Sequence, residues 1–294
     1  MPTSPLHAPV LAWYAKHARD LPWRAPGTSA WGVLVSEIML QQTPVARVLP
    51  VYVGWVQRWP GPGDLAAEAA GEAVRAWGRL GYPRRALRLH EAAVAIVDRH
   101  AGAVPSSYDA LLALPGVGPY TAAAVAAFAF GGRHAVVDTN VRRVLARAVS
   151  GSAQPAPALT VTENRLAETL VPDEPAVAAR WAVAAMELGA TVCTARTPRC
   201  GDCPVSDLCA WRTSGRPAYQ GPVRRPQGYA GTDRQVRGRL LAVLREADDA
   251  VPASMLDAVW SDEPQRRRAL AGLVADGLVE SAGPGSFRLP GDPR

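Results

Sequence analysis

Hydrophobic residues recur every three to four positions along most of this chain, a spacing that predicts amphipathic α-helices. Alternating patterns typical of strands are scarce before residue 277. Turn residues separate the periodic segments, as at 60–63 and 81–83. The main body is predicted to form helices near residues 5–18, 29–42, 45–57, 84–99, 107–113, 119–130, 138–149, 162–170 and 174–188. The expected fold class is therefore all-α.

The pattern changes after residue 216. Residues 217–231 are rich in Pro and Gly and lack periodicity, which predicts a linker. Beyond it, three helices near 235–247, 253–260 and 263–276 precede two short strand-like segments around a Gly-Pro-Gly turn. This order is that of a winged-helix domain, and we call residues 235–294 the C-terminal module. Its third helix carries three consecutive arginines, Arg266, Arg267 and Arg268, which either contact phosphates or form a solvated basic face.

Length and charge limit the kinds of protein that this sequence can encode. A chain of 294 residues is long enough for two or three domains. No run of about 20 apolar residues predicts a membrane span, and the N-terminus lacks the basic start and apolar run of a signal peptide, so we expect a cytoplasmic protein. The formal net charge of +6 suits a polyanionic partner.

An acidic residue stands inside one of the apolar segments. Glu37 is flanked by Leu34 and Ile38, so a helix there would bury it. Burial penalises the charged carboxylate and keeps the group protonated near neutral pH, and a protonated acid can give its proton to a leaving group. The structural alternative is a buried acid that pairs with an arginine such as Arg24 or Arg143.

A glycine-rich turn between two predicted helices is followed by a second acid, Asp138, in another apolar helical segment. The turn reads Leu-Pro-Gly-Val-Gly at 114–118, in which Gly116 and Gly118 permit a tight turn and Pro119 suits the first position of the next helix. Free amides at that helix start would hold a nucleic-acid phosphate, with help from a monovalent or divalent cation. A purely structural turn is the alternative. The two acids and this turn favour acid chemistry on a phosphate-bearing polymer.

All four cysteines lie between residues 193 and 209, with the spacing C-x6-C-x2-C-x5-C. A reducing compartment and this clustering argue for a metal site over disulfides. Four thiolates suit either Zn²⁺ or an iron–sulfur cluster, but these gaps fit the paired spacing of structural zinc sites poorly. The spacing therefore favours the cluster, and Arg196, Arg199 and Arg212 around it would form a basic surface along a phosphate backbone.

Together these features resemble the helix-hairpin-helix DNA glycosylases of base excision repair, and among them the A/G-specific adenine glycosylases, over roughly residues 5–215. The resemblance rests on the four cysteines and on LPWR at 21–24, VSEIMLQQT at 35–43, LGY at 80–82, LPGVG at 114–118, VDTNVRRV at 137–144 and MELG at 186–189. The motifs are specific for this family as a set, whereas no single motif is specific by itself.

The resemblance implies an architecture of a six-helix barrel and an iron–sulfur domain with an active-site cleft between them. The expected domains are an N-terminal helix at 1–27 that packs with the cluster domain, the barrel with its helix-hairpin-helix at 28–135, the cluster domain at 136–215, a linker at 216–234 and the winged-helix-like module at 235–294. It also implies a [4Fe-4S] cluster held by Cys193, Cys200, Cys203 and Cys209.

The resemblance further implies that adenine is flipped out of the duplex, at an unstacking cost of roughly a few kcal/mol. Glu37 would protonate adenine at N7, and Asp138 would stabilise the oxocarbenium-like sugar, as paired carboxylates do in glycoside hydrolysis. Tyr120 and Asn140 match positions that arrange this site. The residues expected to bind DNA or its bases are Arg24, Gln41, Gln42, Thr43, Tyr82, Gly116 and Gly118. Among these, Gln41, Gln42 and Tyr82 match residues that enter the stack and meet the base opposite adenine.

The chain departs from the family pattern in three places. Val183 stands where many members carry Gln or Glu against the adenine edge, and Pro83 follows Tyr82 where a second aromatic residue is common. The C-terminal module is too short for the hydrolase-like domain with which many relatives recognise 8-oxoguanine. A winged helix is expected in its place.

The expected function is that of a monofunctional glycosylase, a nucleoid-associated monomer that removes adenine mispaired with 8-oxoguanine or guanine from double-stranded DNA. A strand-cutting glycosylase for oxidised pyrimidines would need a lysine where Tyr120 stands, and Lys16 is the only lysine of the sequence. A mismatch thymine glycosylase also carries Tyr there but is not expected to hold an acid at Glu37. A non-catalytic iron–sulfur regulator that binds DNA would need neither Glu37 nor Asp138.

Overall fold

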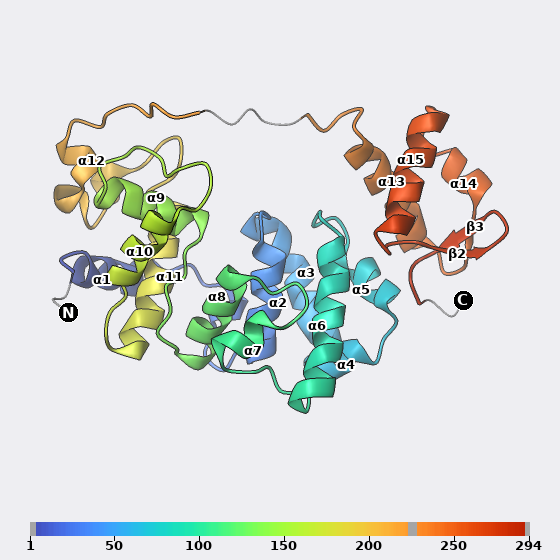
Figure 1. Ribbon diagram of the computed structural model, residues 1–294, viewed down its shortest axis with the longest axis horizontal. Helices are drawn as coiled ribbons and strands as arrows, with labels where there is room; N and C mark the ends of the chain where they lie inside the picture. The colour runs from blue at the N-terminus through green and yellow to red at the C-terminus, as the bar shows by residue number, and fades with distance from the viewer. Residues whose placement is uncertain (1–3, 223–227, 292–294) are drawn as a thin grey trace. The chain divides into compact units, whose positions relative to one another are not determined.

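The computed structural model describes residues 4–222 and 228–291 and is built almost entirely of helices, which confirms the all-α class (Figure 1). Residues 223–227 of the predicted linker lie outside this description. The described residues of Met1–Val33, Ser106–Leu112 and Val117–Arg224 form one compact unit, here unit 1. Those of Leu34–Pro105, Ala113–Gly116 and Arg225–Arg294 form unit 2. In the part of the chain described, no helix is long and apolar enough to span a membrane.

Unit 1 contains the N-terminal helix and most helices after residue 105. Its α-helices are α1 (His7–His17), α7 (Tyr108–Leu112), α8 (Pro119–Phe130), α9 (Thr139–Ala148), α10 (Val161–Thr169), α11 (Pro175–Thr191) and α12 (Ala210–Thr213). Short 3₁₀ turns occur at η1 (Pro22–Arg24), η2 (Cys200–Asp202) and η3 (Ser206–Leu208).

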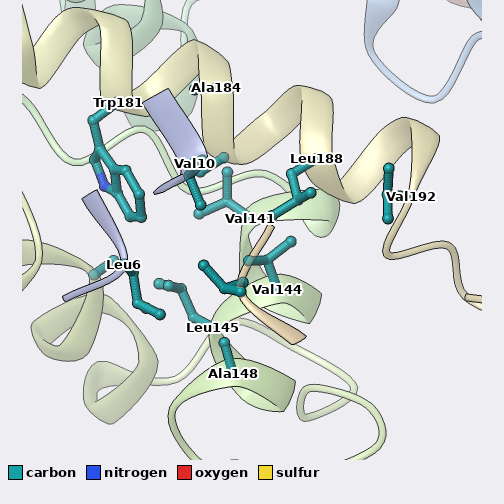
Figure 2. Packing of buried hydrophobic residues seen from close by; sticks show 13 residues of the cluster. Leu6, Val10, Val141, Val144, Leu145, Ala148, Trp181, Ala184, Leu188 and Val192 are labelled. Carbon is teal, nitrogen blue, oxygen red and sulfur yellow. The ribbon is translucent and has the colours of Figure 1, made fainter. Parts of the chain in front are cut away.

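The core of unit 1 forms where α11 packs against α1 and α9. Figure 2 shows Trp181, Ala184 and Leu188 on one side of α11, facing α9 residues such as Val141 and Val144. The spacing of three to four residues on both helices is what places these side chains on one face. This packing fixes α9, the helix that begins beside Asp138.

Unit 2 holds a second core rich in tryptophan. Helix α2 (Ala30–Leu40) begins in unit 1 and ends in unit 2, which also contains α3 (Val45–Arg58), α4 (Pro62–Ala66), α5 (Ala70–Trp77) and α6 (Arg84–His100). Trp55 lies edge-on to Trp59 and Trp77, with ring centroids 4.7 and 5.8 Å apart. All three are at most 1% exposed.

The sequence analysis missed α4 and α5. Residues 60–63 were expected to form only a turn, but α4 begins at Pro62, where proline suits the first helical position. The Asp64 carboxylate accepts a hydrogen bond from the Gly61 amide at 2.8 Å and closes this helix start. Both helices are short, five and eight residues, so they show too few turns for periodicity to reveal them.

The C-terminal module has the predicted winged-helix arrangement. It starts two residues earlier than expected, at Asp233, so that Asp233 is counted with the module from here on. It contains α13 (Asp233–Glu246), β1 (Val251–Pro252), α14 (Ala253–Asp257), α15 (Glu263–Ala275), β2 (Glu280–Gly283) and β3 (Ser286–Arg288). The strands form an antiparallel sheet in the order β1-β3-β2. Strand β1 was not predicted, because two residues carry no alternation.

The three arginines of α15 are engaged inside the module. Arg266 pairs with Asp257 at 2.8 Å, Arg267 pairs with Glu263, and Arg268 pairs with Asp233 at 2.9 Å. Arg267 and Arg268 remain mostly exposed in these pairs, so the two expected roles of this helix, phosphate contacts or a solvated basic face, stay predictions.

Candidate active site

Asp138 is the N-cap of α9 and not a residue within the helix, which corrects the expected helix start. Its backbone is extended (φ −87°, ψ −179°), and one carboxylate oxygen accepts the Val141 amide at 2.6 Å. Aspartate is favoured at this position because it satisfies an amide that has no partner in the first turn. The cap aims the carboxylate and holds it without a flexible backbone.

The surroundings of the Asp138 carboxyl act on its charge in opposite directions. Burial raises its pKa, and hydrogen bonds from the Val141 amide and Asn140 together with the charge of Arg143 lower it, but the net direction is upward. Asp138 is therefore a carboxylate that gains from a nearby positive charge.

A chain of hydrogen bonds leads from Asp138 to the first cysteine. Asn140 donates to the second Asp138 oxygen at 2.7 Å and accepts from Arg143 at 2.7 Å. The Arg143 guanidinium also donates to the carbonyls of Gly189 and Cys193, both at 2.7 Å. Gly189 must be glycine here, because a Cβ would lie 2.7 Å from both Cβ and the carbonyl oxygen of Asn140. This explains why the MELG motif ends in glycine.

We call residues 193–209 the cluster loop. A second buried arginine, Arg147, lies one helical turn further along α9 and holds this loop. Arg147 is 3% exposed and donates to the carbonyls of Thr194 at 2.7 Å and Ala195 at 3.1 Å. It also lies 3.4 Å from the Cys193 sulfur and stacks over the Trp211 ring at 4.8 Å. Arg143 was considered in the sequence only as a possible partner of Glu37, and Arg147 was given no role, although their spacing on one face of a helix was a usable signal.

The four cysteines converge, as their clustering predicted. All are half-buried and unpaired, and all line one pocket together with Arg147 and Trp211. Burial raises the pKa of the Cys193 thiol, which Arg147 and Arg143 oppose, and raises that of Cys203 to about 11. Among the described residues, no three His, Cys, Asp or Glu side chains are grouped tightly enough for a single metal ion. Four thiols spread around one pocket fit a cluster better, since each would bind a different iron.

Glu37 is buried in α2, as predicted. Its exposed fraction is 5%, and the neighbouring Leu34, Ile38 and Met39 are at most 1% exposed. Helix α2 is apolar around most of its circumference, so the Glu37 carboxyl group lies in surroundings that contain little water.

The predicted hairpin forms between α7 and α8. Leu114 and Val117 are buried, which anchors the turn, while Gly116 and Gly118 lie at its surface. Gly116 has φ +75°, and a Cβ there would lie 2.6 Å from the Cβ of Arg88, so only glycine fits. Gly118 is the N-cap of α8, and nothing lies within 4 Å of its Cβ direction. The open space beside Gly118 is compatible with the expected phosphate and cation site, which stays a prediction.

The structure brings Gln42 and Tyr82 together in unit 2. The Tyr82 hydroxyl lies 3.3 Å from the Gln42 side-chain oxygen, and Tyr82 is 54% exposed. Both residues adopt left-handed backbone conformations, with φ +55° and +48°. Such conformations are costly for residues other than glycine and gather at functional positions. We call residues 78–83, which carry Tyr82, the wedge loop.

Arg85 holds this region and was missed in the sequence. Its guanidinium donates to the carbonyls of Ile38 at 2.9 Å and Gly81 at 3.1 Å and to the Thr43 hydroxyl at 3.0 Å. It also donates to the Gln41 carbonyl at 2.5 Å. Burial lowers its pKa to about 10. One arginine therefore joins the end of α2 to the wedge loop, and Thr43 lies inside this junction, 7% exposed.

The remaining predicted residues lie in unit 1. Arg24 donates to Glu187 at 2.9 Å, and Arg19 donates to the same carboxylate at 2.6 Å. Burial would raise the pKa of Glu187, but the two guanidinium groups lower it overall. Tyr120 packs, half-buried, on a small core that includes Val136. Val183 is half-buried on α11.

Known proteins are similar to this chain in sequence over nearly its whole length. It is 56% identical over 285 residues to an adenine DNA glycosylase of Mycolicibacterium smegmatis, covering 96% of this chain and 95% of the relative. It is 55% identical over 284 residues to an adenine DNA glycosylase of Mycobacterium tuberculosis, covering 96% and 93%. The chain belongs to the adenine DNA glycosylase family.

Two family models and a solved structure agree with this membership. The model for HhH-GPD superfamily base excision DNA repair proteins matches residues 35–169, and that for the iron–sulfur binding domain of endonuclease III matches residues 193–209. The structure of a thermostable thymine-DNA glycosylase superposes with a TM-score of 0.62 at 30% identity, covering 70% of this chain and 94% of that one. The helix-hairpin-helix glycosylase fold is thereby confirmed.

Family membership also confirms the iron–sulfur assignment. The matched segment begins at Cys193 and ends at Cys209, and the four thiols that line one pocket fit a [4Fe-4S] cluster. The cluster would supply four iron–thiolate bonds that cross-link the cluster loop. The protein's own contribution is the pair of α9 arginines, which hold the carbonyls of that loop and favour thiolate at Cys193.

Proposed function

We propose that this protein is a monofunctional glycosylase that removes adenine mispaired with 8-oxoguanine or guanine from duplex DNA, acting as a monomer in the nucleoid. The observation that carries the proposal is the similarity to adenine DNA glycosylases over almost the entire chain. Within that family pattern, this chain retains two differently placed carboxyl groups, Glu37 and Asp138. Their surroundings suit two different tasks.

Cleaving the bond between adenine and deoxyribose requires help on both sides of the bond. Adenine leaves poorly as an anion, so an acid must protonate it, and the sugar develops positive charge that a carboxylate can stabilise. Glu37, buried in the apolar α2, is the proton donor in this proposal. Asp138 is the anion, held by the α9 cap and by Asn140 at hydrogen-bond distance.

The electrostatics around Asp138 support its assigned role. The pKa of Asp138 is raised overall, so in the free enzyme the ionised form of this carboxyl group is less stable than that of a carboxyl group in water. A sugar cation that forms beside it relieves this penalty in the transition state, where relief accelerates the reaction. The hydrogen bonds from Val141 and Asn140, and then the charge of Arg143, oppose this penalty and lower the pKa of Asp138 in part.

Tyr120 determines the fate of the DNA strand once the base has been removed. A glycosylase that also cuts the strand needs an amine to form a Schiff base with the opened sugar. Position 120 carries a phenol in place of the lysine of such enzymes, and Lys16 is the only lysine in the chain. The product is therefore an intact strand with an abasic site.

Gln42 and Tyr82 are assigned to the base opposite adenine. They are exposed, hydrogen-bonded to each other and held in strained backbone conformations. An aromatic side chain and an amide together can fill the space left by a flipped base and meet the edge of its former partner.

A second candidate activity is the removal of thymine from T:G mismatches. It is favoured by the likeness to a solved thymine-DNA glycosylase at 30% identity and by the tyrosine at position 120. Thymine lacks the N7 atom that Glu37 would protonate in adenine, so its removal is not expected to depend on that acid. The two candidates therefore differ in their dependence on that residue.

Single-turnover excision from three matched duplexes, containing A opposite 8-oxoguanine, A opposite G and T opposite G, tests the proposal. We expect excision of adenine from the first two and an intact strand until alkali is added. Excision of thymine alone would establish the second candidate. Borohydride should trap no covalent adduct, and a strong adduct that survives Lys16→Ala would contradict the monofunctional assignment.

A further inference from the structure

The C-terminal module is attached to α5 by reciprocal hydrogen bonds within unit 2. Arg75, at the end of α5, donates to the carbonyl of Arg245 and to that of Ala247 at 2.9 Å, at the end of α13. In return, Arg245 donates to the carbonyl of Val74 at 2.9 Å. Each arginine thus satisfies carbonyls that the other helix leaves free at its C-terminus.

The end of the module adds a close backbone contact to the same helix. The Gly71 amide of α5 donates to the Pro290 carbonyl at 2.7 Å. A Cβ on Gly71 would lie 2.8 Å from the Leu289 Cβ and 2.9 Å from the Pro290 carbonyl oxygen. Gly71 has no positive φ, so glycine is required at this position only because the module packs so closely.

A third set of contacts reaches the start of α6. Asp276 at the end of α15 pairs with Arg84, the first residue of α6, at 3.2 Å. The next residue, Gly277, lies beside Leu87 in the first turn of α6. The module therefore holds the last turn of α5 and the first turn of α6. The wedge loop is the connection between those two turns.

The charge of the module does not suit phosphate contacts. Residues 235–294 contain eight arginines and nine acidic residues, a net charge of −1, in a chain whose net charge is +6. The three arginines of α15 are each paired with a carboxylate of the module. Electrostatic attraction to DNA therefore belongs to the rest of the chain.

We propose that the C-terminal module is a positioning element for the wedge loop. By fixing α5 and α6 on either side of this loop, it holds Tyr82 against Gln42 and so sets the enzyme's selectivity for the base opposite adenine. The inference rests on the proposed function, because it assigns that selectivity to Gln42 and Tyr82. It gives the module a role in lesion recognition that requires no contact with DNA.

Two helical glycines of unit 2 provide a matched test. Gly71→Ala places a methyl group against Leu289 and Pro290 and must displace the module, whereas Gly54→Ala in α3 has nothing within 4 Å. We would measure single-turnover excision of adenine opposite 8-oxoguanine and opposite guanine. Gly71→Ala should lower the ratio of the two rates about tenfold, the scale expected for a displaced recognition group. Gly54→Ala should leave the ratio unchanged.

Combination with Tyr82→Ala separates positioning from a general loss of structure. If the module acts through Tyr82, then Gly71→Ala should lower the ratio no further once Tyr82 is absent. An equal tenfold loss in both backgrounds, or an unchanged ratio for Gly71→Ala in the otherwise wild-type enzyme, would overturn the proposal.

A charge-matched pair of variants keeps the test decisive if Gly71→Ala does not fold. Asp276→Asn removes the link to Arg84 together with a pair to Arg237 within the module, whereas Asp233→Asn removes a pair with Arg268 that lies wholly within the module. Both raise the net charge by one. Only Asp276→Asn should lower the ratio, about two- to fivefold for a half-exposed ion pair, and equal ratios for the two variants would contradict the inference.

A fluorescent readout distinguishes failure of this inference from failure of the proposed function. 2-Aminopurine placed beside the mispair reports insertion of the wedge without any excision. If wild-type enzyme removes no adenine, the proposed function fails. If it removes adenine but the Gly71→Ala and Gly54→Ala enzymes give the same fluorescence change and the same ratio, only the positioning role fails.

Discussion

The start of α9 and the wedge loop present their side chains in opposite ways. Asp138 has an extended backbone, caps a regular helix and lies at the end of a buried hydrogen-bond chain. Gln42 and Tyr82 lie at the surface in left-handed conformations. The first arrangement costs little backbone strain and leaves the carboxylate almost no freedom. The second holds two exposed side chains on a strained backbone.

Both regions nevertheless depend on an arginine that donates to backbone carbonyls, a buried one beside Asp138 and a half-buried one beside the wedge loop. Arg143 does so for Gly189 and Cys193 beside Asp138, and Arg85 does so for Ile38 and Gln41 beside the wedge loop. A rigidly held group such as Asp138 suits the task of stabilising charge during the reaction, because it need not reorganise. A strained, exposed backbone such as that of Gln42 and Tyr82 suits side chains that must enter a base stack. The comparison predicts that damage to the first region slows chemistry, whereas damage to the second changes selectivity.

The largest effect is expected from Glu37→Gln, which removes the proposed proton donor. Single-turnover excision of adenine should fall at least about 10²-fold, the lower end for general acid catalysis, while duplex affinity stays near wild type. Glu168→Gln on α10, an exposed glutamate with the same change of charge, serves as the control. Excision within a few-fold of wild type would remove Glu37 from the mechanism.

Arg143→Gln should slow excision about tenfold or more, because Asp138 loses its support through Asn140 and a 1 Å misplacement is costly. It should also lower the free energy of unfolding by about 2–4 kcal/mol, since buried carbonyls lose their donor. Arg142→Gln is the control. It breaks an equally buried ion pair, with Glu163 at 2.7 Å, on another face of α9. Equal losses of excision per folded molecule for the two variants would show that only stability was affected.

Arg85→Gln should act on selectivity more than on rate. Without its bonds to Gln41 and Thr43, the wedge loop and the end of α2 lose their common anchor. The ratio of excision opposite 8-oxoguanine to that opposite guanine should fall about tenfold. Arg88→Gln, one turn along α6 in an exposed pair with Glu91, should leave the ratio unaltered. A uniform loss on both duplexes would place Arg85 in the chemistry instead.

The smallest effect is a displacement of the acid limb of the pH–rate profile. Excision requires ionised Asp138, so the rate falls as pH falls through its pKa, and the upward shift places this limb above the usual value of 3.8. Asn140→Ala removes a hydrogen bond that lowers the pKa and should move the limb to still higher pH. Single-turnover rates across the acid range measure both positions. A limb that moves to lower pH would contradict the assignment.

The comparison of these regions also shows what local patterns could predict. The helices that carry the functional groups follow from periodicity, as for Glu37 in α2. The LPGVG turn follows from Gly116, whose position accepts only glycine. Helices α4 and α5 escaped prediction, because short segments are defined by the surfaces that they cover. Arg85 escaped for a similar reason, since its partners are carbonyls of residues about 40 positions earlier.

By itself, the sequence determined the helical class, the four-cysteine loop, the absence of a usable lysine and the two acids, because each depends on residue type and spacing over a few turns. Only the tertiary structure decided that Asp138 is a cap tied through Arg143 to the cluster loop, that Arg85 anchors the wedge loop, and that the arginines of α15 pair with carboxylates of their own module. The physical reason is the same in each case. A buried guanidinium must find acceptors wherever the fold supplies them, and those acceptors are backbone carbonyls and distant carboxylates that no local pattern reveals.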